Sequence, residues 1–81
     1  MPKVRRRGVP RPLLEHLWQR VEEREVSLRQ LELFATWLEE EPDVPAGKWF
    51  KKFPEMTVCG EGELVRTFLR VGQIADGQEV A

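Results

Sequence analysis

The sequence predicts an α+β fold: a helical hairpin over about residues 12–24 and 28–41, followed by an aromatic anchor segment and a β-hairpin over about residues 56–69. Two observations predict this class. Apolar residues recur at helical spacing through the first half, whereas the second half alternates around a glycine-rich turn. With 81 residues the chain forms one domain at most, with a thin core. We expect that domain to span residues 12–71.

The first helix is predicted to begin near Pro12, because proline suits the first turn of a helix. Its apolar residues return at spacings of one, three and four, which gathers them into a stripe about 140° wide. The stripe consists of Leu13, Leu14, Leu17, Trp18 and Val21. We therefore expect the first helix to turn these side chains toward the core.

The second helix carries the clearest start signal in the chain. Ser27 is a strong N-cap, and Gln30 three residues later completes a capping box. Val26 and Leu31 form the matching hydrophobic staple. Pro42 cannot continue a helix, so the helix is expected to end just before it.

The second helix also has two apolar faces. The larger face comprises Leu28, Leu31, Phe34, Ala35 and Leu38. The smaller face consists of Leu33 and Trp37. In so small a chain one face packs on the first helix. The other packs on the C-terminal third or meets a partner, and the sequence leaves both interpretations open.

Residues 48–53 place aromatic side chains at i, i+1 and i+4, a helical spacing, although aromatic residues favour strands. We expect a short helix or turn here. The hairpin then pairs residues 56–59 with residues 63–69 around the glycine-containing turn at 60–62. Simple alternation in its second strand assigns one face to Leu64, Arg66 and Phe68.

Charge is distributed unevenly along the chain. Residues 1–11 contain no acid and are predicted to form a flexible basic arm. The cations of this arm are Lys3, Arg5, Arg6, Arg7 and Arg11. Residues 12–45 hold nine acids against three arginines, a balance of −6. Residues 72–81 are expected to be a polar tail.

Side chains that carry catalysis are scarce. His16 is the only histidine and Cys59 the only cysteine, so they cannot supply a four-ligand zinc site, and no second histidine is left to orient a nucleophile. The only serine, Ser27, is taken by the helix cap. We therefore expect no enzyme activity, no metal and no cofactor. Without an apolar run of about 18 residues, a signal peptide or a cysteine pair, the expected location is the cytoplasm, with no membrane partner.

A nucleic-acid-binding accessory protein is the alternative function that the sequence suggests. The basic arm could neutralise phosphates through Lys3, Arg5, Arg6, Arg7 and Arg11. A helix-turn-helix reading is disfavoured, because the second helix is acidic and would repel the DNA groove.

A non-enzymatic protein-binding module is the leading interpretation. The acids Glu39, Glu40, Glu41 and Asp43 are expected to attract a basic partner. Leu33 and Trp37 are expected to provide the apolar anchor. Self-association remains open as well, because a two-stranded hairpin needs cover.

Residues 47–73 contain the strings Gly-Lys-Trp-Phe-Lys-Lys-Phe and Thr-Val-Cys-Gly-Glu-Gly-Glu-Leu-Val-Arg-Thr-Phe-Leu. This third of the chain resembles small uncharacterised prokaryotic proteins of antitoxin type. The resemblance implies a protein that binds and silences a partner such as a basic ribonuclease-like toxin. The chain departs from standard antitoxins because it shows neither a ribbon-helix-helix nor a helix-turn-helix pattern, so operator binding is not implied.

Overall fold

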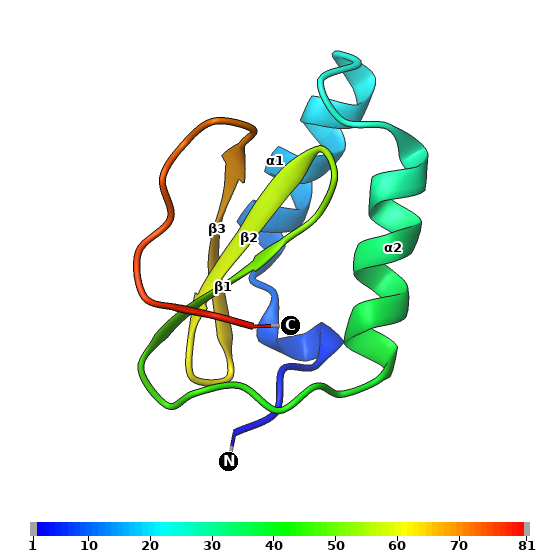
Figure 1. Cartoon of the computed structure of the whole chain (residues 1–81). Helices are drawn as coiled ribbons and strands as arrows, with labels where there is room; N and C mark the ends of the chain where they lie inside the picture. The colour runs from blue at the N-terminus through cyan, green and yellow to red at the C-terminus, as the bar shows by residue number, and fades with distance from the viewer. Residues whose placement is uncertain (1, 81) are drawn as a thin grey trace.

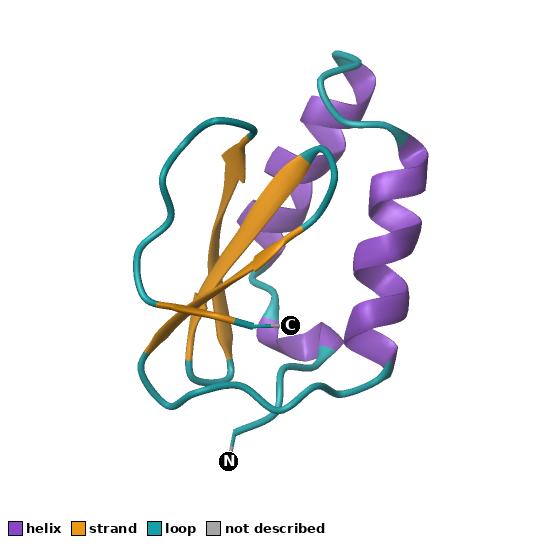
Figure 2. Cartoon of the chain, in the orientation of Figure 1, coloured by secondary structure: helices purple, strands orange, loops and turns teal. Residues whose placement is uncertain are grey.

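The computed structural model describes residues 2–80. A 3-10 helix, η1 (Arg6–Gly8), precedes the helices α1 (Arg11–Glu22) and α2 (Leu28–Glu39) (Figure 1). The strands are β1 (Lys48–Lys52), β2 (Met56–Glu61), β3 (Leu64–Arg70) and β4 (Gln78–Glu79). Within the described residues the strands form one mixed sheet in the order β3-β2-β1-β4 (Figure 2). The predicted α+β class, with two helices before the sheet, is confirmed.

Residues 48–52 form strand β1 of the sheet, so the expectation of a short helix or turn over residues 48–53 is wrong. β1 pairs antiparallel with β2 along one edge and parallel with β4 along the other. This pairing gives its backbone hydrogen-bonding groups partners on both sides, which a six-residue helix in the same place could not do. The helical spacing of the aromatics is incidental: Trp49 is fully buried, and the next side chain, Phe50, is half-buried on the other face.

The hairpin of β2 and β3 contains an irregularity that simple alternation does not predict. The register shifts between Cys59 and Gly60, so that Cys59 pairs with Thr67 whereas Gly60 pairs with Val65. Arg66 is the extra residue, as in a β-bulge. As a result Val65 and Phe68 are both buried, and the predicted common face of Arg66 and Phe68 does not exist.

The tight turn of this hairpin lies at Gly62 and Glu63, later than expected. Gly62 has φ +57°, a backbone conformation that suits glycine. The residues after β3 were expected from the sequence to be a polar tail. They cross to the far edge of the sheet, where the Val80 N–H donates a 2.7 Å hydrogen bond to the Phe50 carbonyl oxygen.

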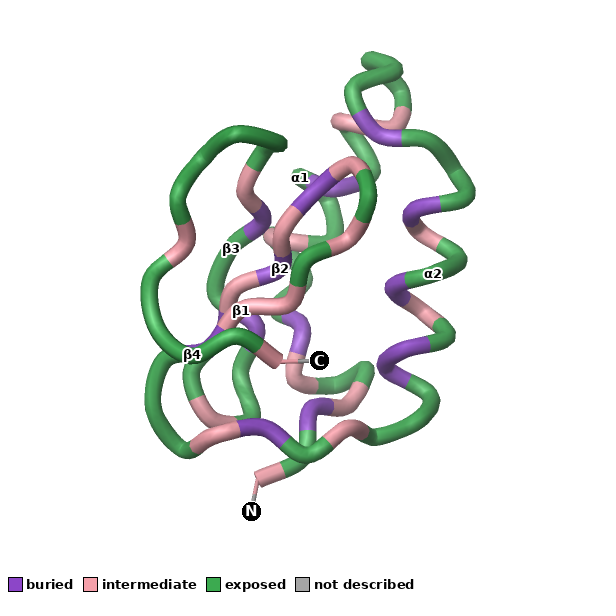
Figure 3. The backbone as a smooth tube through the Cα atoms, viewed as in Figure 1, coloured by how far each residue is buried: buried purple, intermediate pink, exposed green. Residues whose placement is uncertain are grey.

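One core joins both helices to the buried face of the sheet (Figure 3). Phe34 of α2 lies edge-on to Phe68 of β3, with ring centroids 5.4 Å apart. α1 contributes Leu17, which is fully buried. Leu14 and Trp18 of the predicted core stripe are instead 42% and 53% exposed. The core-facing arc of α1 is therefore narrower than its apolar stripe.

The start of α2 is secured by a tertiary contact instead of the predicted capping box. Ser27 stands at the N-cap, but its Oγ donates a 2.8 Å hydrogen bond to the Glu55 carboxylate, which also accepts the Ser27 N–H. Gln30 is buried and its side-chain oxygen accepts the Glu55 N–H at 3.1 Å. The turn between β1 and β2 therefore supplies the acceptor that the sequence pattern assigned to Gln30.

Residues 2–9 pack against the domain and do not form the free arm that their composition suggests. Val4 and Val9 are buried in the core. The Val4 N–H donates to the Pro42 carbonyl oxygen at 3.1 Å, and the Val44 N–H donates to the Pro2 carbonyl oxygen at 2.9 Å. Two buried valines are enough to hold this basic segment against the domain once its backbone groups have hydrogen-bond partners in the neighbouring chain. The overall composition of the segment does not reveal such packing.

Candidate functional site

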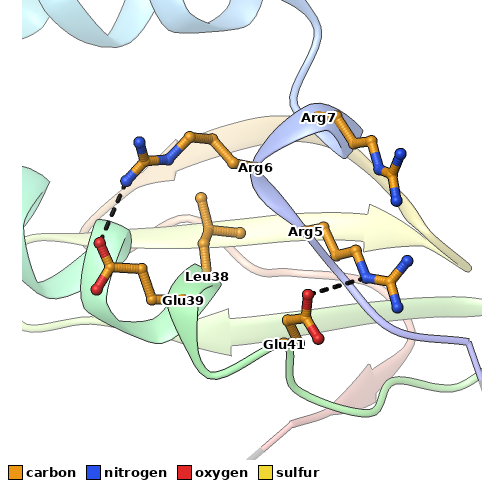
Figure 4. Close-up of a pocket in the computed structure, with 6 residues that line it drawn as sticks. All are labelled: Arg5, Arg6, Arg7, Leu38, Glu39 and Glu41. Carbon is orange, nitrogen blue, oxygen red and sulfur yellow. Dashed lines mark hydrogen bonds and ion pairs between the residues drawn. The ribbon is translucent and has the colours of Figure 1, made fainter.

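Several of the cations and acids predicted from the sequence as site residues lie opposite each other in the structure. A shallow pocket of about 350 Å³ separates η1 from the end of α2, and its walls carry both charges (Figure 4). Its lining residues are Arg5, Arg6, Arg7, Leu38, Glu39 and Glu41. Two of the candidate partner-binding acids, Glu39 and Glu41, thus line the same pocket as three of the candidate phosphate-binding cations, Arg5, Arg6 and Arg7.

Three ion pairs connect the basic segment to the acids. Arg6 Nη2 lies 3.3 Å from Glu39 Oε1, and Lys3 Nζ lies 3.1 Å from Asp43 Oδ1. Figure 4 shows Arg6 reaching toward Glu39 and Arg5 reaching toward Glu41, whereas Arg7 points away from both acids. The third pair joins Arg5 Nε to Glu41 Oε1 at 3.2 Å, without hydrogen-bond alignment.

These ion pairs are exposed, so each contributes only about 0–1 kcal/mol to stability. Their larger consequence is electrostatic. The cations of residues 3–7 lie beside the acids of residues 39–43, and the two sets cancel much of each other's field. The acidic segment therefore attracts a basic partner less than its sequence suggests, and the basic segment attracts phosphate less. The fifth cation of the predicted arm is Arg11, whose Nε lies 3.9 Å from Glu15 Oε1 on the surface of α1.

Trp37 is a core residue, so its prediction as a surface anchor is wrong. Only 7% of it is exposed, and its ring stacks on Phe34 and lies 5.7 Å from the ring of Trp49. The cause is the rotation of α2: the buried arc is centred between Gln30 and Phe34 and includes Trp37, because Gln30 turns inward to the β1–β2 turn. Leu33, the other predicted anchor, is 37% exposed.

The structure reveals a surface patch that the sequence analysis assigned to the core. Leu14 and Trp18 lie one turn apart on the side of α1 that the core does not use, beside a shallow hollow of about 570 Å³. The hollow is lined by Arg11, Leu14, Glu15, Trp18, Gln19 and Glu22. We call these six residues the α1 patch. The signal that could have found it is the 140° apolar stripe, which is wider than one helix of so small a domain can bury.

The potential catalytic groups do not converge. His16 is exposed on α1, and Cys59 is half-buried on β2. Burial raises the pKa of the Cys59 thiol above its ordinary value, which disfavours the nucleophilic thiolate. Across residues 2–80 no three His, Cys, Asp or Glu side chains are grouped to hold a metal ion. In the same range neither helix is long and apolar enough to span a bilayer.

The raised pKa of Cys59 predicts slow alkylation. In native protein at pH 8 we expect iodoacetamide to modify Cys59 at least about tenfold more slowly than in urea-unfolded protein, since both burial and the low thiolate fraction oppose the reaction. Because the folded-state pKa of Cys59 is raised, the protonated thiol contributes to the free energy of unfolding. This contribution is fully present below the pKa of the unfolded state and is lost as pH rises through the pKa of the folded state. Mass spectrometry over time measures the rates, and equal rates in the two states would contradict the prediction.

The fold and its surface define a small α+β protein with two helices packed on a mixed sheet and an exposed tryptophan patch on the first helix. No family model matches the chain, and no curated protein or solved structure is similar enough to count as a match.

Proposed function

We propose that the protein is a non-enzymatic protein-binding module whose anchor is the α1 patch. The observation that carries this proposal is the exposure of Leu14 and Trp18 side by side, with 42% and 53% of their surfaces in water. A single exposed apolar residue is ordinary, but tryptophan is strongly enriched in interface hot spots, and here it lies next to a second exposed apolar side chain on one helix face. This patch replaces Trp37 as the apolar anchor.

The charges beside the patch favour a basic partner. Glu15 and Glu22 line the hollow and Glu23 follows at the end of the helix, against one cation, Arg11. This excess of acid complements a basic surface and raises the rate of encounter with it. The resemblance of residues 47–73 to antitoxin-type proteins supports the same kind of partner, a basic ribonuclease-like toxin that this protein would silence.

The acids of residues 39–43 then have a secondary role. Glu39 and Glu41 are already paired with Arg6 and Arg5, so a partner's cations must displace the side chains of this segment before they can bind there. Such exchange is feasible because the pairs are exposed and weak. The exchange of ion pairs does not require the backbone of residues 2–9 to move, because Val4 and Val9 are buried in the core.

Binding of nucleic acid through the basic segment is less well supported, because three of its cations are paired with acids of the same chain. Deleting residues 1–9 would not test it, since the deletion also removes Val4 and Val9 from the core. Nuclease treatment during partner capture is the better discriminator. A captured protein that survives nuclease supports the proposed function, and captured nucleic acid without protein contradicts it.

The test is capture of the partner from host lysate by tagged full-length protein. We expect Trp18→Ser to reduce the stoichiometric co-purifying protein at least about tenfold, because the loss of a hot-spot tryptophan costs about 2 kcal/mol or more of binding free energy. Quantitative mass spectrometry measures the captured protein. Leu28→Ser is the matched control, because Leu28 is 58% exposed on α2, and it should capture as wild type does. Equal capture by Trp18→Ser and wild type would overturn the proposal.

A further inference from the structure

The charge pattern of the α1 patch is complementary to that of a second α1 helix running in the opposite direction. Arg11 begins the helix, Leu14 and Trp18 occupy the middle of the exposed face, and Glu22 ends the helix with Glu23 at its C-cap. These residues follow the 3–4 spacing that brings side chains to one seam between packed helices. If two such helices pack antiparallel, the cation of each helix lies beside the acid of the other at both ends of the pair. The apolar residues of the two helices then meet in the centre.

The same charges are unfavourable for α1 in isolation. The positive end of its dipole carries Arg11 and no acid in the first turn, whereas its negative end carries Glu22 and Glu23. Arg20, the basic residue of the last turn, borders a different hollow beside Glu25. A second helix that runs antiparallel reverses both mismatches, because each charge then lies next to an opposite charge and an opposite dipole end.

We infer that a second copy of this chain occupies the α1 patch when no other partner is present. The two α1 helices pair antiparallel about a two-fold axis level with the middle of the Leu14–Trp18 interval. Leu14 of each copy packs on Trp18 of the other, and Arg11 of each copy reaches Glu22 of the other. Such an interface is isologous, so each contact occurs twice.

The interface is small, which sets the expected strength. A helix of 12 residues is about 18 Å long. Two such helices bury less than the roughly 800 Å² per partner of a standard stable complex. We therefore expect a weak dimer that dissociates on dilution through the micromolar range. Competition between this dimer and a heterologous partner rests on the proposed function, but self-association itself does not.

Sedimentation equilibrium of the purified full-length protein tests the inference. Wild type is expected to sediment as a concentration-dependent dimer. Arg11→Glu or Glu22→Arg alone should weaken association about tenfold or more, because each places two pairs of like charges across the two-fold axis. The double variant Arg11→Glu with Glu22→Arg restores opposite charges and should recover the dimer. Both single changes improve the match to the dipole of α1. Arg11→Glu also removes the exposed ion pair of Arg11 with Glu15, which contributes little to stability, so unfolding would not explain a loss of association.

Arg29→Glu is the control for a change of net charge, because Arg29 is an exposed cation on α2 and it should leave association unchanged. The inference is overturned if wild type stays monomeric up to about 1 mM, or if the double variant associates no better than the single variants. Since no partner is present, this result is independent of the capture experiment. A monomeric wild type whose Trp18→Ser variant loses its partner would reject the dimer alone, and a dimer that captures nothing through Trp18 would reject the proposed function alone.

Discussion

Gly60→Ala is expected to lower the free energy of unfolding by at least about 3 kcal/mol. A Cβ at Gly60 would overlap the indole ring of Trp49 and lie 2.6 Å from the Leu64 carbonyl oxygen. The ring cannot move aside, because Trp49 is fully buried and its Nε1–H donates a 2.9 Å hydrogen bond to the Gly62 carbonyl oxygen. For a chain of this length total stability is on the order of 4–12 kcal/mol, so the loss is severe.

Urea denaturation followed by far-UV circular dichroism measures the effect of Gly60→Ala. Gly47→Ala is the matched control, because a Cβ at Gly47 meets nothing within 4 Å. The control removes a glycine from the connector just before β1 and should change the free energy of unfolding by less than about 1 kcal/mol. A midpoint for Gly60→Ala close to that of wild type would mean that Trp49 does not pack as described.

Trp37→Ala is expected to lower the free energy of unfolding by about 3–5 kcal/mol, because it leaves a large cavity in the core. The lost contacts are those of Trp37 with Phe34, Trp49 and Phe53, whose ring centroids all lie within 6.3 Å of its own. In a domain of this size the change lowers the melting temperature by at least about 15 °C. Thermal unfolding followed by circular dichroism at a fixed protein concentration provides the measurement.

Trp18→Ala provides the contrast, since the same substitution is made on an exposed part of α1. We expect it to change the free energy of unfolding by less than about 1 kcal/mol. The pair of variants therefore separates a structural tryptophan from a candidate binding tryptophan. If Trp18→Ala proved as destabilising as Trp37→Ala, then Trp18 would belong to the core and the α1 patch would lose its support.

The candidate site illustrates how far local sequence reasoning reaches. Composition singled out the charged segments 3–11 and 39–43 as candidates for binding. It could not foresee that the first faces the second, because their proximity depends on long-range backbone pairing between Lys3 and Asp43. Helical periodicity likewise identified the apolar residues of both helices but not which of them the core would cover. The stripe of α1 is wider than its buried arc, and α2 is rotated so that Gln30 and Trp37 face the core.

The local signals of the chain determined its α+β class, the two helices, the hairpin and the scarcity of catalytic side chains. Tertiary structure decided the rest. The strand at β1 exists because β2 and β4 provide hydrogen-bond partners on both sides, and the bulge at Arg66 turns Val65 inward. Trp37 is buried and Trp18 exposed because a thin core has room for only part of the apolar surface that the sequence offers. Helical periodicity predicts which residues can be buried. Which of them are buried depends on how the helices and strands pack around a core of limited volume.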